Sequence, residues 1–265
     1  MPEGHTIHRI AKDHSLWLAG RPVRVSSPQG RFEADAARIN GQVLDKIEAY
    51  GKHLFYWWAN GDVGHVHLGL FGKFRVAMGP DAPEPVGMVR MRLHTDLATI
   101  DLAGPTDCAV GTPDDRAKIL ARLGPDPLRR DARPQLAIDR MAKSKLAVGA
   151  LLLDQKVLCG VGNVYRAEAL FVNGIHPLRA GVDTDAIELE ALWKTVVAML
   201  RKGVRDNRIV TVDPRDVELP KDRRLRRGEA TYVYHRDRCL RCGTAVQTVK
   251  LGGRACYFCP TCQAH

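Results

Sequence analysis

Four of the seven cysteines in this chain fall in two Cys-x-x-Cys pairs, CLRC and CPTC, separated by sixteen residues. Each pair can bend so that two thiolates reach one metal ion, and two pairs complete a closed tetrahedral site for Zn²⁺. We therefore predict one structural zinc ion per chain. Its ligands would be Cys239, Cys242, Cys259 and Cys262. Redox pairs or a disulfide are the alternative, which the short polar sequence between the pairs disfavours because it cannot build a core without a metal.

The stretch KLGGRACYFC between these cysteines predicts a β-hairpin with Arg254 at its glycine-rich tip. A rigid hairpin with a basic tip suits a phosphate group, whereas the ordinary alternative is a solvated arginine. The remaining cysteines, Cys108, Cys159 and Cys256, are most simply core or incidental residues.

Pro2 and Glu3 at the start of the chain could do chemistry of a different kind. A small residue after the initiator methionine usually allows its removal, so we expect Pro2 to carry a free secondary α-amine. Such an amine titrates near ~8, against ~10.4 for lysine, and is the better unaided nucleophile at neutral pH. Attack on an aldehyde-like carbon would give an iminium, with Glu3 transferring protons. The alternative is a frayed terminus without a role.

Three further stretches could contact a nucleic acid. In LCGVGNVYRAEAL, Gly160 and Gly162 would let backbone amides approach a phosphate, and the asparagine that follows them would cap a helix or bind that phosphate; a plain helix connection is equally open. Lys52 lies at a tight turn between two predicted strands. Leu70 and Phe71 lie in a glycine-flanked loop, either as core residues or as wedges that fill a gap in a base stack.

The composition favours a polyanionic partner. The 265 residues carry 40 Lys and Arg against 30 Asp and Glu, a formal net charge of +10, and the sequence pI is near 9.4. Nucleic acid is the first candidate. No apolar run is long enough for a bilayer span and no targeting segment is evident, so we expect a cytoplasmic protein that makes no use of membranes.

Periodicity predicts an α+β chain. Apolar residues at helical spacing predict a helix over 4–18, and short alternating runs from 22 to 102 predict a β-sandwich or flattened barrel, with a turn at Gly51-Lys52. Thr112 should cap a following helix. After a proline-rich linker, KSKLAVGALLLDQKVL and two later segments predict a helical domain.

These features, taken in order, closely resemble the formamidopyrimidine-DNA glycosylase and endonuclease VIII (Fpg/Nei) family. The motifs that carry the resemblance span nearly the whole chain: MPEG, GKHLF, HLGLFG, LGPDPL, GALLLDQ, GVGNVYRAEAL and GGRACYFCPTCQ. The resemblance implies an N-terminal helix with a β-sandwich, then a helix-two-turn-helix domain with a β-hairpin zinc finger. Damaged double-stranded DNA would lie in the cleft between them, and the bacterial-type enzyme would be a monomer that associates with the nucleoid when bound to DNA.

The resemblance also implies a domain organisation and residue roles. Residues 1–118 would form the catalytic domain, 119–134 an interdomain segment, 135–228 the helix-two-turn-helix domain and 229–265 the zinc finger. Residues 205–230 read as a polar, charged and mobile stretch.

Matched residue by residue, Pro2 would attack C1′ of the damaged nucleotide, releasing the base and forming a Schiff base, with Glu3 as its acid/base partner. Lys52 would contact phosphate and assist proton transfer in β-elimination. Asn163 and Arg254 would grip the phosphates that flank the lesion, and Arg254 would also serve δ-elimination.

The remaining implied roles concern the wedge and the branch of the family. Leu70 and Phe71 would fill the hole left by the flipped nucleotide, and Arg122 would contact DNA. The formamidopyrimidine branch usually has a second glutamate where Thr6 stands, and its Arg/Phe wedge loop is not visible in LAGPTDCAV. Both departures favour the endonuclease VIII branch and oxidised pyrimidines. Gly69 stands where that branch often has a polar wedge residue, which leaves the reading of the opposite base open.

Three alternatives remain from the sequence. One is a same-family enzyme that prefers 8-oxoguanine or formamidopyrimidines, and one is a non-catalytic zinc-finger protein that binds damaged DNA. The third keeps only the abasic-site lyase activity. The non-catalytic alternative leaves Pro2 and Glu3 unexplained.

Overall fold

The computed structural model describes residues 2–216 and 225–264, and the chain divides into two compact units. The N-terminal unit comprises Met1–Glu3 and Ile7–Arg122. The C-terminal unit comprises Gly4–Thr6 and Leu123–His265. The two units separate at Arg122, where helix α3 has ended and the polar GPDP turn follows.

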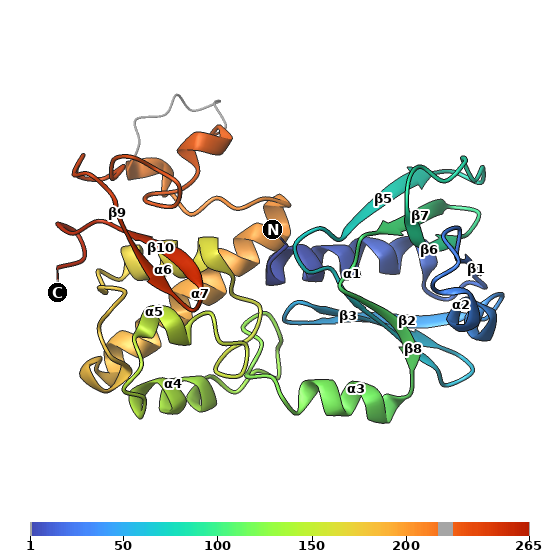
Figure 1. Cartoon of the computed structure of the whole chain (residues 1–265), viewed down its shortest axis with the longest axis horizontal. Helices are drawn as coiled ribbons and strands as arrows, with labels where there is room; N and C mark the ends of the chain where they lie inside the picture. Colours follow the sequence, from blue (N-terminus) through green and yellow to red (C-terminus); the bar gives the residue numbers. More distant parts are fainter. Residues whose placement is uncertain (1, 217–224, 265) are drawn as a thin grey trace. The chain divides into compact units, whose positions relative to one another are not determined.

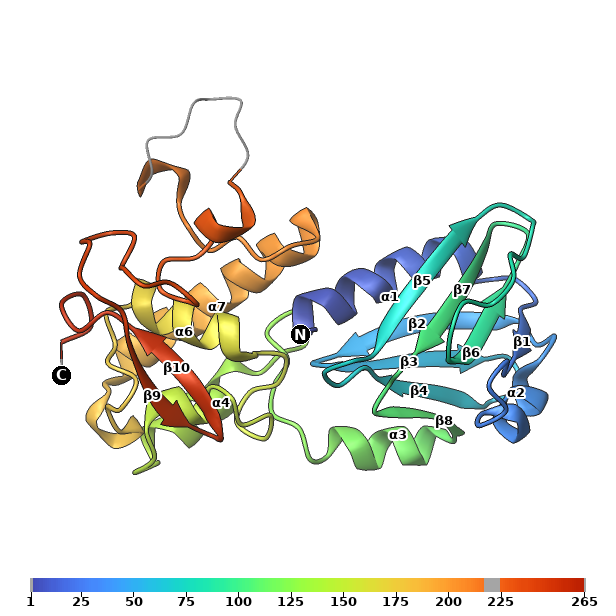
Figure 2. The same ribbon diagram turned by 45° about the horizontal axis from the view of Figure 1, so that its top comes forward.

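The N-terminal unit is a β-sandwich with a helix alongside it (Figures 1 and 2). The helix α1 spans Gly4–Leu18. One antiparallel sheet has the order β1 (Arg24–Ser26), β6 (Val89–His94), β7 (Ala98–Ala103) and β5 (Lys73–Met78). The other has the order β2 (Leu44–Tyr50), β3 (His53–Trp58), β4 (Val63–His67) and β8 (Asp107–Gly111). Two short helices complete the unit, α2 (Glu33–Ile39) and α3 (Pro113–Leu120).

Alternation along the strands places one face of each sheet in a common core. Leu54 and Tyr56 of β3 and Leu93 of β6 are all buried in this core, together with Leu18 of α1. The predictions for helix α1 and for the strands on both sides of Gly51-Lys52 are confirmed. Thr112 caps α3 in a capping box, as predicted.

Helix α2 lies inside the region for which only strands were predicted, so that prediction was wrong there. The reason is a helical spacing of apolar residues: Phe32, Ala36 and Ile39 are all buried in the sandwich core. The acidic residues Glu33 and Asp35 stand in the first turn of α2, where they favour a helix start.

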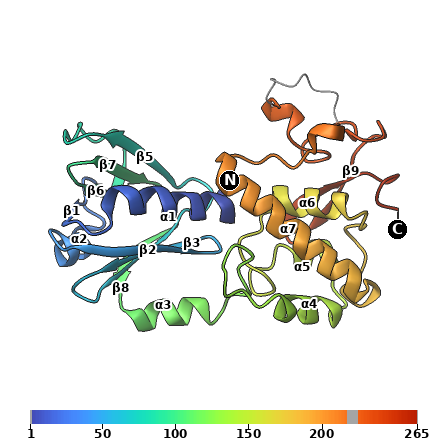
Figure 3. The same ribbon diagram turned by 180° about the vertical axis from the view of Figure 1, so that it is seen from behind.

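The C-terminal unit is helical (Figure 3) and contains a two-stranded hairpin near its end (Figure 2). Its α-helices are α4 (Pro134–Ala142), α5 (Val148–Leu151), α6 (Asn163–Val172) and α7 (Ala186–Asp206). Within the described residues, this unit also has the 3₁₀ turns η1 (Gly181–Asp183), η2 (Pro214–Asp216) and η3 (Arg227–Glu229). The hairpin strands are β9 (Gln247–Leu251) and β10 (Arg254–Phe258), as the sequence predicted.

The helix predicted over KSKLAVGALLLDQKVL is much shorter than its apolar pattern suggested. Only α5, of four residues, forms there. The backbone amides of Val148 and Gly149 donate instead to the carbonyl groups of Arg179 and Pro177, at 2.8 and 3.1 Å. These two backbone N–H groups are therefore bonded to a distant segment and not to the preceding turn of a longer helix. The local apolar pattern does not reveal such a partner.

The proline-rich linker and the stretch 205–230 are both partly packed into the C-terminal unit. Asp126 is buried and Gly124 N donates to the Gln155 carbonyl at 2.8 Å. Val210 and Val212 are buried in a cluster with Leu225, so the mobile character predicted for this stretch was wrong at its ends. Residues 217–224, the middle of the same prediction, lie outside the described residues.

One buried carboxylate organises the chain that leads into the zinc-finger region. Glu168 of α6 is fully buried. It accepts hydrogen bonds from the backbone amides of Tyr232, Val233 and Tyr234 at 2.7, 2.9 and 2.9 Å and from the Thr211 hydroxyl at 2.5 Å. Burial raises the pKa of Glu168, and these hydrogen bonds oppose that shift. In the part of the chain that the structure describes, no helix is long and apolar enough to cross a membrane.

Replacing Glu168 by alanine should destabilise the C-terminal unit strongly. Three backbone amides, of which those of Tyr232 and Val233 are buried, and one hydroxyl would lose their shared acceptor, which we expect to cost more than about 3 kcal/mol. Thermal and urea unfolding measure the effect. Glu190→Ala on the exposed side of α7, whose ion pair with Lys194 is 3.7 Å long, is the control and should change stability by less than about 0.5 kcal/mol. Equal losses in both variants would contradict this role.

Candidate functional site

Pro2 and Glu3 are held at the start of a well-anchored helix. Glu3 is the N-cap residue of α1, its carbonyl accepts from Ile7 N at 3.4 Å, and its side chain is fully buried. Pro2 is half-buried. Ile7 and Leu18 fix α1 in the sandwich core. The terminus is thus tied down by a helix, and the frayed alternative does not describe it.

The glycine of the MPEG motif has a steric reason. Gly4 groups with the C-terminal unit, in which its backbone N donates to the Gly160 carbonyl at 2.7 Å. A Cβ on Gly4 would lie 2.9 Å from the Cα of Gly160, closer than such contacts occur. Gly160 itself has φ +93, a left-handed conformation that glycine adopts at little cost. Both glycines are therefore required by backbone geometry at this contact.

Lys52 and Arg122, both in the N-terminal unit, act electrostatically on the same histidine. Lys52 follows Gly51, whose φ of +57 makes the tight turn between β2 and β3. The charges of both Arg122 and Lys52 help to lower the pKa of His53, after burial as the main cause. The structure thus brings these two predicted DNA contacts near one end of β3.

The predicted wedge residues are exposed at the tip of a compact loop. The exposed fractions of Leu70 and Phe71 are 57% and 83%. Gly72 N donates to the Leu68 carbonyl at 2.9 Å and closes the loop. The core alternative for both side chains is therefore wrong, and two large apolar groups stand in solvent where they can contact a partner.

Gly69 at the base of this loop has a specific neighbour. Its φ is +64, and a Cβ at this position would lie 1.9 Å from the hydroxyl oxygen of Thr106. The Thr106 side chain therefore occupies the space in which any side chain at position 69 would begin. This explains why a polar residue is not accommodated here.

In the C-terminal unit, Asn163 and Arg254 are joined through the hairpin backbone. Asn163 is the first residue of α6, and the N-cap residue of this helix is Gly162, so the capping alternative for Asn163 is wrong. Asn163 Nδ2 instead donates to the Ala255 carbonyl at 3.0 Å. Arg254 is exposed at the start of β10, opposite Leu251.

Arg166 holds this arrangement together, and the sequence analysis missed it. The fully buried guanidinium of Arg166 donates to the Leu251 and Ala255 carbonyls at 3.0 and 3.1 Å and to Asn163 Oδ1. It also reaches the carbonyl of Arg254 at 3.5 Å. The sequence offers one signal for this role, an arginine three residues after Asn163. Its burial, which the sequence does not show, is what makes several acceptors necessary.

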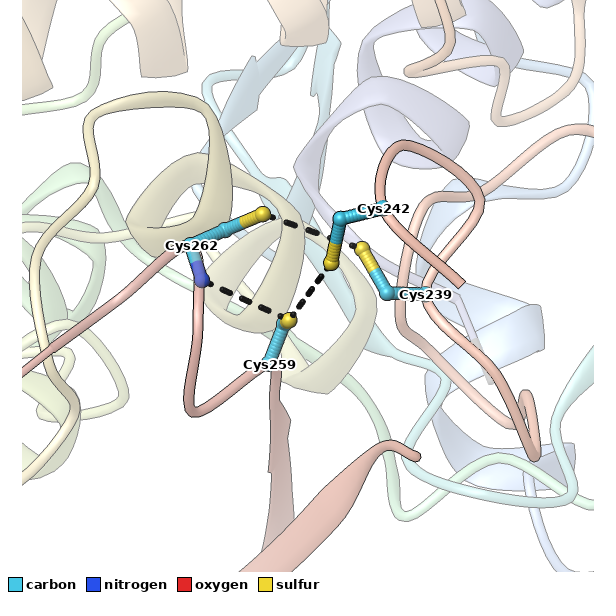
Figure 4. A group of neighbouring side chains, drawn as sticks. All are labelled: Cys239, Cys242, Cys259 and Cys262. Carbon is cyan, nitrogen blue, oxygen red and sulfur yellow. Dashed lines mark hydrogen bonds between the residues drawn. The ribbon is translucent and has the colours of Figure 1, made fainter. Parts of the chain in front are cut away.

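The four cysteines of the two pairs converge, as predicted (Figure 4). Their sulfur atoms all lie within 4.8 Å of one another. The Cys239 and Cys262 sulfurs are 4.0 Å apart, and the Cys242 and Cys259 sulfurs are 3.4 Å apart. Zn–S bonds of about 2.3 Å in a tetrahedron put sulfurs about 3.8 Å apart, so the donor set fits zinc.

The fold and these residues define an α+β protein with a β-sandwich unit and a helical unit that carries a Cys₄ hairpin. Three family models match the chain: the Formamidopyrimidine-DNA glycosylase N-terminal domain at residues 1–106, the Formamidopyrimidine-DNA glycosylase H2TH domain at 123–213, and the zinc finger found in FPG and IleRS at 236–264. The helical unit is therefore a helix-two-turn-helix domain, as expected.

Sequence relatives extend over the full chain. Endonuclease 8 1 of Mycobacterium tuberculosis is 46% identical over 269 residues, covering 99% of this chain and 100% of that protein. DNA-(apurinic or apyrimidinic site) lyase Nei2 of Mycolicibacterium smegmatis is 33% identical, covering 99% of each chain. A complex of Lactococcus lactis Fpg with abasic-site DNA has the same fold, with a TM-score of 0.81 at 21% identity over 99% of this chain and 100% of that one. The chain belongs to the Fpg/Nei family of DNA glycosylases with abasic-site lyase activity.

Gly69→Ala should misplace the wedge loop. The left-handed φ costs about 1 kcal/mol for alanine, and the new Cβ collides with Thr106. We expect incision of abasic-site duplexes to fall about tenfold, and Thr106→Ala in the same chain to restore most of it by removing the collision. Gly61→Ala is the control, because Gly61 has φ +86 but open space around its Cβ position. An unchanged rate in Gly69→Ala would contradict the assignment.

Arg166→Lys should separate positioning of the hairpin from its folding. Lysine keeps the charge but cannot reproduce the guanidinium fork that reaches several carbonyls at once. We expect the zinc content to stay at the wild-type level while the incision rate falls by about 10- to 100-fold, because the Arg254 backbone shifts. Metal analysis and single-turnover incision are the measurements. Loss of zinc together with activity would show that Arg166 supports folding alone.

Proposed function

We propose that this chain is a bifunctional DNA glycosylase and abasic-site lyase of base excision repair that acts on damaged double-stranded DNA, with oxidised pyrimidines preferred. The observation that carries the proposal is the position of Pro2, directly before a buried Glu3 and an anchored helix; removal of Met1 would give Pro2 a free secondary amine. The names of the sequence relatives, an endonuclease 8 and an abasic-site lyase, support the same activity.

The chemistry would begin at the Pro2 amine. Its lone pair forms a bond to C1′ of the damaged nucleotide as the bond from C1′ to the base breaks, and the base leaves with a proton. Loss of the amine proton and opening of the sugar leave an iminium between Pro2 and C1′, with Glu3 exchanging protons with the sugar. The positive end of the α1 dipole disfavours a protonated amine at this position.

Strand cleavage follows from the acidity of the iminium. Removal of a C2′ proton expels the 3′ phosphate oxygen in β-elimination, and removal of a C4′ proton then expels the 5′ phosphate oxygen in δ-elimination. Water hydrolyses the remaining iminium and frees Pro2. In this scheme Lys52 assists proton transfer, and Arg254 holds the phosphate that leaves in the second elimination.

The other predicted residues would bind the DNA. Asn163 and Arg122 contact phosphates, which fix the register on the duplex without reading sequence. Leu70 and Phe71 enter the base stack and offset part of the few kcal/mol that flipping a nucleotide costs. Their exposure at a closed loop supports this role.

The four cysteines would hold one structural Zn²⁺. The ion supplies no reaction step and stabilises the hairpin, because such short units fold only with their metal. The proposal places the hairpin tip with Arg254 on the DNA backbone.

The preference for oxidised pyrimidines rests on Thr6, which replaces the second glutamate usual in the formamidopyrimidine branch, and on the 46% identity with an endonuclease 8. Thr106 occupies the space of a side chain at Gly69, so its hydroxyl is the polar group nearest to where that branch carries a polar wedge residue.

Incision of end-labelled duplexes tests the proposal. The duplexes carry thymine glycol, dihydrouracil, 8-oxoguanine opposite cytosine, or an abasic site. We expect wild type to cleave at the oxidised pyrimidines and to leave a 3′ phosphate, and Pro2→Gly to lose at least about 100-fold in rate, together with the borohydride-trapped adduct.

Binding of Pro2→Gly to a duplex with a tetrahydrofuran abasic analogue is the control for folding. Preference for 8-oxoguanine would move the chain to the other branch, and cleavage of abasic sites alone would leave only the lyase. Binding without any cleavage by the wild type would identify a non-catalytic protein.

A further inference from the structure

Three histidines gather on one face of the sheet that carries Lys52. His53 of β3 stands directly opposite His67 of β4, and His65 stands opposite Phe55, one pair further along the same face. The neighbouring residue Leu54 points the other way, into the sandwich core. The histidines are therefore on the outer face of the sheet, where all three are half-buried.

Two of these histidines form a hydrogen-bonded pair. His53 Nδ1 lies 2.9 Å from His65 Nε2, and the ring centres of His53 and His67 are 4.8 Å apart. One nitrogen of the pair must donate and the other accept. The pair can gain one proton on an outer nitrogen and keep this bond, but a second added proton would set two N–H groups against each other. It therefore holds at most one positive charge.

The surroundings of the pair are mainly cationic. The groups that face the cluster from the packed elements are Tyr50 on β2, Lys52 in the turn, Asp107 on β8, Arg116 on α3 and Arg122 after α3. Glu48 pairs with Arg116 and so neutralises it. Among these groups only Asp107 raises the pKa of His65 and His67.

These surroundings keep the histidines neutral. Burial, then the neighbouring histidines, Arg122 and Lys52, lower the pKa of His53 to about 3. Burial also lowers the pKa of His65 to about 4, against the opposing effect of Asp107. At neutral pH the pair is therefore an uncharged group beside two permanent cations.

The arrangement does not match a metal site. In the described part of the chain, the group of three or more histidine, cysteine or carboxylate ligand atoms that could hold a metal ion is the four-cysteine cluster, whose sulfur atoms lie within 4.8 Å of one another. The two closest histidine nitrogens, on His53 and His65, contact each other directly. A proton between them accounts for that contact, whereas an ion would have to separate them.

We propose that the His53–His65 pair is a proton-linked phosphate contact, which takes up one proton when a backbone phosphate of the DNA docks against Lys52 and Arg122. This inference rests on the proposed DNA-binding function. A phosphate anion would offset the charges of Lys52 and Arg122 that now oppose protonation and would attract the new charge. The bound state then holds more protons than the free state, so affinity rises as the pH falls.

The test uses the intact protein and a duplex with a tetrahydrofuran abasic analogue, which cannot form the Schiff base. Calorimetry at pH 6 in two buffers of different ionisation enthalpy gives the protons taken up on binding. Anisotropy at constant ionic strength gives the affinity between pH 5.5 and 7.5. We expect wild type to take up close to one proton at low pH and to bind up to about tenfold more tightly per pH unit.

His53→Gln and, separately, His65→Gln should abolish most of this uptake while still binding the duplex at pH 7.5. His235→Gln, which removes an exposed histidine of the C-terminal unit, is the matched control and should keep the wild-type uptake. Wild type and the three variants share the Pro2 amine, so any proton that this amine takes up on binding cancels in the comparison.

Tight binding with the same proton uptake in wild type and in both pair variants would overturn the inference and leave the proposed function intact. Tight binding by wild type without proton uptake would do the same. No binding of the duplex by wild type at any pH would overturn both proposals.

Discussion

The anchoring of helix α1 is the constraint on which the proposed chemistry depends. A terminal amine is ordinarily mobile, whereas attack on one sugar carbon requires it to be held to within a fraction of an ångström. The helix removes that freedom because it begins at the residue after Glu3 and buries Ile7, Ala11 and Leu18 in the sandwich core. The same helix start places Glu3, the N-cap residue of α1, in a buried position. One helix would therefore position the proposed nucleophile, its proposed proton-transfer partner and a dipole that disfavours the protonated amine.

A similar problem arises at the other predicted phosphate contact. A two-stranded hairpin is at best marginally stable alone, yet Arg254 must be presented at its tip. The structure supports the hairpin at both ends. Cys259 directly follows β10 and joins the four-sulfur cluster, while the buried Arg166 binds the carbonyl groups around the turn. A metal held by the cysteines at one end would thus add to the guanidinium at the other and to the packing of Cys256 in the core of the helical unit.

Much of the fold could be predicted from the sequence because its signals are local. Helix α1, the strands around Gly51-Lys52 and the zinc hairpin all follow from periodicity, glycine positions or cysteine spacing. The features that escaped prediction depend on residues far apart in the chain. Arg166 bonds to carbonyl groups about ninety positions away, and the amides near α5 bond to a segment about thirty residues later. A sequence met alone does not show which distant acceptor a buried side chain will find.

Charge alone does not separate a protein that binds DNA from an enzyme that cleaves it, since a net charge of +10 serves both. An enzyme is distinguished from a binding protein by features that DNA binding does not require. A binding protein gains nothing from burying the Glu3 carboxylate, because a buried acid lowers the affinity for phosphate and has a desolvation cost. A buried acid next to a terminal secondary amine is useful where protons must move at a carbon that the amine attacks. The surface cations would thus bring the DNA to the protein, and in the proposed mechanism the buried acid next to Pro2 marks where the reaction takes place.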